Sequence, residues 1–171
     1  MSNARGFSLI ELLLVVAVIG ILAAIAIPNL LSARRSANEG SAVSTLRTLH
    51  GADVTYAATS GAGSYAGTAA TPGTSSLAGL YAASLIDSAL SAGTKSGYSF
   101  IGDWTQNTAA SPATFYFAAN PTYTASLIQS GTRRFGVATD GVLKVDASGA
   151  NLAVPFDAAT LPPAQAFASG N

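Results

Sequence analysis

The hydrophobic residues of this chain gather in one long run near the start of the sequence. Residues 7–31 read FSLIELLLVVAVIGILAAIAIPNLL, and no charged residue falls between Glu11 and Arg34. In a helix, these residues extend roughly 37 Å, which exceeds the ~30 Å hydrocarbon core of a bilayer. The run is also longer than the apolar region of a cleaved secretory signal. We therefore predict a membrane-spanning helix over residues 7–31.

A second helical pattern follows directly, and in it the apolar residues fall on one face of the helix. One face of this helix carries residues spaced by four, three, four and three: Ala42, Leu46, Leu49, Asp53 and Tyr56. The segment is also rich in alanine, which is a strong helix former. We predict one long helix from Phe7 to Ala58, kinked at Pro28. Its second half, residues 32–58, is expected to be amphipathic and to continue into a globular domain.

Residues 59–96 have weaker local preferences. The stretch from Thr59 to Gly79 is rich in Gly, Ser, Thr and Ala, and Pro72-Gly73 is a turn signal. This composition predicts a variable loop. The sequence LYAASLIDSAL at residues 80–90 predicts one or two short helical turns before the chain reaches the next regular pattern.

The region 97–146 predicts an antiparallel sheet. Four segments have the alternation and the β-favouring composition of strands: 97–104, 114–119, 133–139 and 142–145. Asp140-Gly141 joins the last two and predicts a two-residue type I′ turn, which needs positive φ at both positions. The sequence thus predicts an α+β fold with about four strands. Residues 147–171 form an Ala-, Pro- and Ser-rich C-terminal tail, in which Pro162-Pro163 argues against regular structure.

The composition excludes several classes of function. The eight basic and eight acidic residues cancel, so no basic surface for nucleic acid is expected. The chain has no Cys, which excludes disulfides, thiolate metal sites and a Cys nucleophile. Asp140, Asp146 and Asp157 invite a calcium hypothesis, but their spacing matches no calcium loop. We assign no catalytic, cofactor-binding or metal-binding residue, and we do not expect an enzyme.

Glu11 is the unexpected residue in the apolar run. A carboxylate at membrane depth is costly unless it is paired or protonated, so a partner is expected. If the chain is cut after Gly6, Phe7 becomes a new N-terminus whose ammonium can pair with Glu11. Within one chain this geometry is awkward, because Glu11 lies a turn further along the same helix. Between two staggered parallel helices the pairing is natural.

The sequence GFSLIE at residues 6–11, followed by the apolar run and PNLL at residues 28–31, resembles the class III signal of type IV prepilins and type II secretion pseudopilins. The resemblance covers residues 4–35. It implies that a prepilin peptidase removes a leader, residues 1–6, by cutting between Gly6 and Phe7, and then methylates the Phe7 amine. It also implies that Glu11 recruits and registers each incoming subunit.

The same resemblance implies a pilin fold, with one long N-terminal helix packed on an antiparallel sheet and its hydrophobic half protruding. It implies several partners: further copies of the chain, the peptidase, an inner-membrane assembly platform with its ATPase, and membrane lipid before assembly. Many major pilins close their C-terminal region with a disulfide. This chain has no Cys, so hairpin pairing, packing or a neighbour must hold that region.

Gly20 and Pro28 both weaken the apolar helix, since Gly costs about 1 kcal/mol and Pro about 3 kcal/mol in a helix interior. Lipid favours an intact helix, because unsatisfied backbone groups are expensive there. Similar pilins stretch in this region on assembly. We therefore predict a continuous helix in the isolated precursor and a partly unwound segment, residues 20–28, in the filament.

Three functions remain open at the level of sequence. The first is a type IV pilus subunit, which passes from the inner membrane into an extracellular filament. The second is a type II secretion pseudopilin, whose short filament stays in the periplasm. The third is a membrane-anchored binding module that never polymerises and needs neither cleavage nor Glu11. The size of the domain and its Ser/Thr-rich loop favour the pilus.

Overall fold

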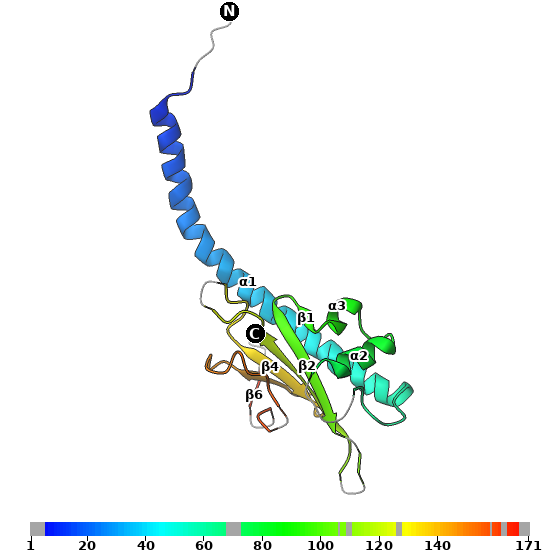
Figure 1. Ribbon diagram of the computed structural model, residues 1–171. Helices are drawn as coiled ribbons and strands as arrows, with labels where there is room; N and C mark the ends of the chain where they lie inside the picture. Colours follow the sequence, from blue (N-terminus) through cyan, green and yellow to red (C-terminus); the bar gives the residue numbers. More distant parts are fainter. Residues whose placement is uncertain are drawn as a thin grey trace, which may run out of the picture. The chain divides into compact units, whose positions relative to one another are not determined.

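The computed structural model describes residues 6–67, 73–105, 107–108, 111–125, 128–157, 159–161 and 164–167. Its elements are shown in chain order in Figure 1. The chain divides into two compact units, residues 1–34 and residues 35–171. Leader residues 1–5, Pro72 of the expected turn and Pro162-Pro163 of the expected tail lie outside the described residues.

One helix, α1, runs from Leu9 to Thr59 and contributes to both units (Figure 1). The predicted long N-terminal helix is confirmed, although it begins at Leu9 rather than Phe7. The carbonyl of Ser8 accepts the first hydrogen bonds, from the N–H groups of Glu11 (3.1 Å) and Leu12 (3.2 Å). The helix therefore starts one turn before Leu12.

In the globular unit, residues 35–171, the predicted face of α1 is buried. Ala42, Leu46 and Leu49 are at most 1% exposed. They share one core with aromatic side chains from one face of the sheet: Tyr98, Phe100, Phe117 and Phe135. Transfer of these apolar side chains out of water is the main favourable contribution to the stability of the unit.

Two short helices add to the same core. They are α2, Ser75–Ala82, and α3, Ser88–Ser91. The short helical turns expected in this region are present, but the prediction of a loop as far as Gly79 is wrong. Leu77 of α2 is fully buried in the core, and this tertiary contact stabilises a helix that local propensity alone does not support.

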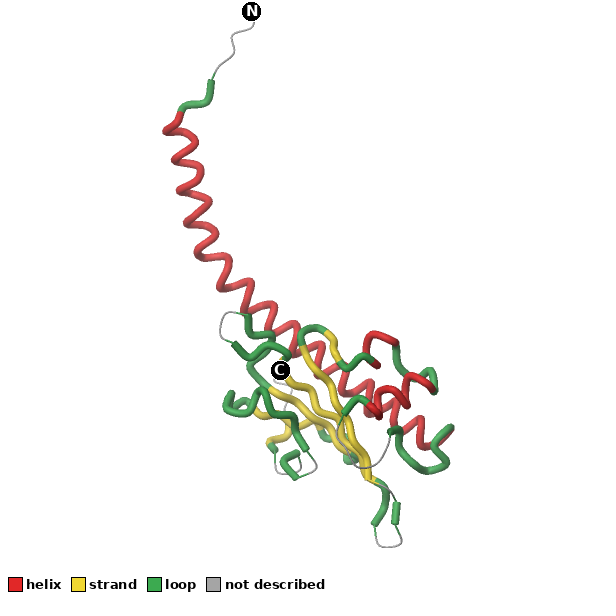
Figure 2. Tube along the Cα trace, in the orientation of Figure 1, coloured by secondary structure: helices red, strands yellow, loops and turns green. Residues whose placement is uncertain are grey.

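The sheet has six strands in sequential order rather than the four expected, and each pairs antiparallel with the next (Figure 2). The strands are β1 Thr94–Lys95, β2 Tyr98–Thr105, β3 Thr114–Pro121, β4 Arg134–Ala138, β5 Leu143–Asp146 and β6 Gln165–Ala166. The four central strands are those predicted from the sequence. The two extra strands are two-residue edges, which are too short to show a period of alternation.

The hairpin between β4 and β5 is confirmed, but its turn is not the expected type I′. Val137 pairs with Leu143, so the connection is longer than two residues. Gly141 has a φ of 70°, whereas Asp140 does not adopt positive φ. The Asp140 carboxylate instead accepts the N–H of Val142 at 3.0 Å. This hydrogen bond between the Asp140 side chain and the backbone closes the turn, so a second residue with positive φ is not needed.

The second face of the sheet is covered by residues 147–157, which we name the C-terminal strap, and by Leu161. Phe156 of the strap packs with Leu161 against Tyr116 and Ala118 of β3. These apolar contacts explain why a segment expected to be an irregular tail holds a fixed place on the sheet. The sequence pattern did not predict them, because isolated apolar residues in an Ala- and Pro-rich segment show no period.

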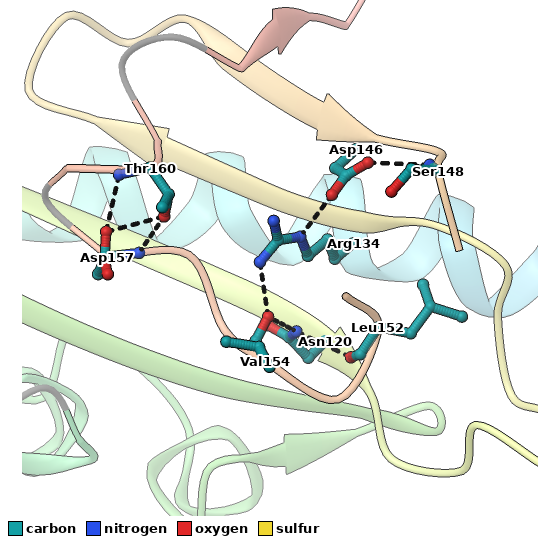
Figure 3. Close-up of polar contacts among 8 residues, drawn as sticks. All are labelled: Asn120, Arg134, Asp146, Ser148, Leu152, Val154, Asp157 and Thr160. Atoms are coloured by element: carbon teal, nitrogen blue, oxygen red, sulfur yellow. Dashed lines mark hydrogen bonds and ion pairs between the residues drawn. The ribbon is translucent and has the colours of Figure 1, made fainter. Parts of the chain in front are cut away.

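Polar contacts also fasten the strap to the sheet (Figure 3). The Asn120 side-chain amide donates to the carbonyls of Leu152 (3.0 Å) and Val154 (2.9 Å). The Arg134 guanidinium donates to the Val154 carbonyl (2.7 Å) and to the Asp146 carboxylate (2.9 Å). The arginine also lies over the Phe156 ring, 4.1 Å from its centroid. These contacts hold the strap in a chain that has no Cys.

Replacement of Arg134 by Met is expected to loosen the strap. The change leaves the Asp146 carboxylate and the Val154 carbonyl without their cationic donor and lowers the free energy of unfolding by about 3 kcal/mol. Amide hydrogen exchange across residues 147–157 should accelerate. Lys144→Met, on the neighbouring strand β5, removes a cation that makes none of these contacts and serves as the control. Unchanged exchange in the Arg134 variant would show that packing alone holds the strap.

Asp53 of α1 is a fully buried carboxyl. Its Oδ1 accepts the backbone N–H of Ala66 at 2.8 Å, which ties the segment after α1 to the helix. Its Oδ2 has no hydrogen-bond partner among the described residues. Burial raises the pKa of Asp53 to about 6, and the hydrogen bond from Ala66 offsets this effect only in part.

The stability contributed by protonated Asp53 is expected to be complete below pH about 4 and to be lost as the pH rises through about 6. The sign follows because the folded-state pKa lies above the ordinary value of 3.8, and the difference corresponds to about 3 kcal/mol. Asp53→Asn keeps an acceptor for Ala66 and should be more stable than the parent at pH 8, by about 1–3 kcal/mol. Urea unfolding in detergent, followed through the single Trp of the chain, measures the difference. A variant less stable than the parent at pH 8 would refute this account.

Candidate functional site

The expected cleavage residues lie directly before the N-terminus of α1. Gly6, Phe7 and Ser8 precede the helix and have no regular structure. The Phe7 side chain is 83% exposed. A Cβ added at Gly6 meets nothing within 4 Å, so the fold itself does not require glycine at this position. The backbone around the Gly6–Phe7 bond is therefore accessible to an enzyme.

Glu11 lies in the first turn of α1, and its side chain is exposed. A carboxylate at this end of a helix is favoured by the helix dipole. The ion pairs found among the described residues join Glu39 to Arg133 and Asp146 to Arg134, and neither uses Glu11. The single chain thus presents this carboxylate on the surface of the helix, where another chain can reach it.

The rest of the first unit is an apolar helix with no buried face. Its large apolar side chains between 45% and 66% exposed are Leu12, Leu13, Leu14, Val15, Val16, Val18, Ile19, Ile21, Leu22, Ile25 and Ile27. By length and composition, α1 is the one helix among the described residues that is apolar enough to cross a membrane, a test that a signal sequence also passes. An apolar surface on all sides of a helix requires lipid or protein around it.

The two expected helix breakers both lie within α1. The helix continues through Gly20 and Pro28 in the single chain. A Cβ added at Gly20 meets nothing within 4 Å, so no contact in the chain requires this glycine. Next to Pro28, the Asn29 side-chain amide donates to the Ile25 carbonyl at 3.1 Å. This bond supports the turn in which proline lacks its own N–H group.

The described residues contain no group of three or more His, Asp or Glu side chains placed to hold a metal ion. The three aspartates of the calcium hypothesis are each used in a local turn instead. Asp140 accepts from Val142, Asp146 from Ser148, and Asp157 from Thr160. Hydrogen bonds from the Ser148 backbone and side chain, and then the Arg134 guanidinium, lower the pKa of Asp146.

The sequence predicts roles for residues at the N-terminus, and it gave no sign of the residues that fasten the strap of the globular unit. Gly6, Phe7 and Glu11 are recognisable because they belong to one contiguous motif. Asn120 and Arg134 gave no such signal. Each is an ordinary polar residue in a strand, and its role depends on main-chain carbonyls that fold back from far along the sequence.

Comparison with known proteins places the similarity at the N-terminus. Residues 1–27 match the family described as the prokaryotic N-terminal methylation motif. The chain is 67% identical over 39 residues to the type IV wide pilus major component PilA4 of Thermus thermophilus. It is 48% identical over 52 residues to the type IV major pilin protein PilA of Myxococcus xanthus. The expected resemblance to type IV pilins is confirmed by these matches.

The matched segments are short relative to the whole proteins. They cover 23% of this chain and 30% of the Thermus protein, and 30% of this chain and 24% of the Myxococcus protein. No solved structure matches the chain. The similarity therefore concerns the segment that carries the candidate site.

Proposed function

We propose that this chain is a structural subunit of a type IV pilus, made as a precursor, cleaved after Gly6 and polymerised through its N-terminal helix. The observation that carries the proposal is the combination of a matched methylation motif with an apolar helix exposed on all sides. A structural role, rather than catalysis, fits both named relatives. Their names, a pilus component and a major pilin, favour the pilus over the pseudopilus.

In this proposal, cleavage creates the charge that assembly uses. The cut between Gly6 and Phe7 leaves an ammonium group on Phe7, and methylation of an amine keeps its positive charge. The ammonium of an incoming subunit pairs with Glu11 of its neighbour. The two groups lie at different heights within one chain, and a stagger between parallel helices brings the Phe7 amine of one chain level with Glu11 of the next. Both charges are then satisfied inside an apolar bundle, where either one alone is strongly unfavourable.

The proposal assigns a sequence of partners and compartments. Membrane lipid surrounds the apolar helix of the precursor, which spans the inner membrane once. A prepilin peptidase removes residues 1–6 and methylates Phe7. An inner-membrane platform, driven by its ATPase, then transfers the helix from lipid to the bundle of neighbouring helices in an extracellular filament.

Deletion of the chain separates the three functions considered above. We expect cells without it to lose filaments from their surface, and antibodies against the globular unit should decorate the filaments of the parent cells along their length. Intact surface filaments together with loss of protein secretion would indicate a pseudopilin. An uncleaved chain that stays in the membrane would indicate a binding module that does not polymerise.

The segment from Gly20 to Pro28 is expected to unwind in part when the chain enters the filament. In the single chain it is helical, but Pro28 cannot donate a hydrogen bond to Ala24, and Gly20 weakens the preceding turn. Full extension from about 1.5 to about 3.3 Å per residue lengthens this segment by roughly 16 Å at most. Neighbouring helices can then contact backbone groups that lipid cannot satisfy.

The double variant Gly20→Ala, Pro28→Ala tests the unwinding. It strengthens the helix without a clash at Gly20, where the added Cβ has open space. Its filaments should differ from the parent in helical rise and should extend less under load. Gly40→Ala, where the Cβ also has open space, controls for a change of helix propensity outside the segment. An unbroken helix through residues 23–27 in a parent filament map would contradict the prediction.

A further inference from the structure

The globular unit carries opposite charges toward the two ends of β2, an exposed Lys95 and a half-buried Asp103. Lys95 is an exposed residue of β1 and pairs with Tyr98 at the start of β2. Ser96, in the same turn, hydrogen bonds Ser41 of α1 (3.0 Å), so this end of the sheet lies beside the helix. Asp103 lies five residues after Tyr98, a distance of about 17 Å along an extended strand.

A pocket of about 270 Å³ opens at the Asp103 end of the sheet. Asp103 and Asp140 line it, together with Phe115 and Tyr116. No Lys or Arg is found in the part of the lining that the structure describes. A pocket of this kind suits an extended basic side chain, whose methylene groups contact the apolar lining while its charge lies near the two carboxylates.

Carboxylates also act on the phenol of Tyr116, which is one of the residues that line this pocket. Burial, followed by the carboxylates of Asp103 and Asp157, raises the pKa of Tyr116 to about 12. The potential therefore favours a cation and opposes an anion.

We propose that this pocket binds the Lys95 side chain of a second copy, so that globular units join head to tail. The inference rests on the proposed function, because it takes the copies to lie parallel along one filament. A contact between two different surfaces repeats from copy to copy without closing, and such a contact builds a filament. The chain itself supplies both complementary surfaces, which favours a second copy over a small cation.

Exposed ion pairs are individually weak and are screened by salt over about 10 Å at 0.1 M ionic strength. The contact is repeated at every subunit, however, and its contribution to filament stability adds to that of the apolar helix bundle. The pairing therefore sets the register of neighbouring globular units and makes filament stability sensitive to salt.

Reciprocal charge reversal tests the contact in cells that carry each variant in place of the parent. Asp103→Lys and Lys95→Asp should each lower the yield of sheared filaments about tenfold, because like charges then meet at every contact. The variant with both changes again places opposite charges at positions 95 and 103, beside the unchanged Asp140, and should recover part of the lost yield. Asn151→Lys, at an exposed residue that does not line the pocket, controls for altered net charge and should assemble normally.

A milder variant guards against a folding defect. Asp103→Asn with Asp140→Asn removes both charges but keeps a side-chain oxygen for the N–H groups of Trp104 and Val142. Its filaments should lose most of their salt sensitivity. Normal yield and salt sensitivity in all these variants would overturn the contact, as would losses in both single reversals that the combined variant does not recover. Failure of the proposed function is distinguishable, because the parent chain itself then forms no filament.

Discussion

A Glu11→Ala chain is expected to be cleaved normally and yet to form no filaments by itself. The proposed cut lies at Gly6–Phe7, a turn before Glu11, and the substitution leaves this peptide bond accessible. We expect assembly to fail because, in the proposed pairing, the Phe7 ammonium of each incoming subunit would enter an apolar bundle without its partner, at a cost of about 3–5 kcal/mol per contact. Intact mass measurement of the membrane fraction and quantification of sheared filaments separate the two steps.

Glu11→Gln gives the matched comparison, since it keeps a hydrogen-bond acceptor of similar size and loses only the charge. We expect it to assemble at an intermediate level. Ser8→Ala, which changes a residue of the same segment without touching a charge, should assemble like the parent. Abundant filaments made of the Glu11→Ala chain alone would remove the central role given to this carboxylate.

A Gly6→Leu chain is expected to accumulate in the membrane as an uncleaved precursor and to give no filaments. Glycine lets the scissile backbone approach a peptidase closely, and a leucine side chain at the same place prevents that approach. The chain itself has room for the new side chain, because a Cβ at Gly6 meets nothing within 4 Å. The defect therefore lies in processing rather than in folding.

The fold of the Gly6→Leu chain provides its own control. Its unfolding in urea, followed through the single Trp in the globular unit, should match that of the parent. The mass of the membrane-bound chain should include residues 1–6. Filaments at the parent yield, built from subunits that begin at Phe7, would show that cleavage does not depend on glycine at this site.

The parts of the fold that the sequence predicted are those with a long or strong local pattern. The apolar run and the Leu46 and Leu49 stripe extend over many turns, so α1 was predicted almost to its ends. The four central strands alternate or carry aromatic residues and were also found. The edge strands β1 and β6 have two residues each and exist only through pairing with β2 and β5, so no local pattern identifies them.

The polar residues that fasten the strap and the segment after α1 could not be predicted from the sequence for a different reason. Asn120 and Arg134 act on the carbonyls of Leu152 and Val154, which lie more than a dozen residues further along the chain. Likewise, the predicted helix face included Asp53, but the pattern could not show that one of its oxygens lacks a partner in the core. Only the assembled packing shows which polar groups are satisfied and which are not.

In the proposed function, this chain becomes a filament subunit through cleavage after Gly6 and methylation of Phe7. Intact mass spectrometry of subunits taken from sheared surface filaments tests it most directly. We expect a mass equal to residues 7–171 plus one methyl group. Fragmentation should place this methyl group on the amine of Phe7. A filament subunit that retains residues 1–6, or surface filaments that lack this chain altogether, would contradict it.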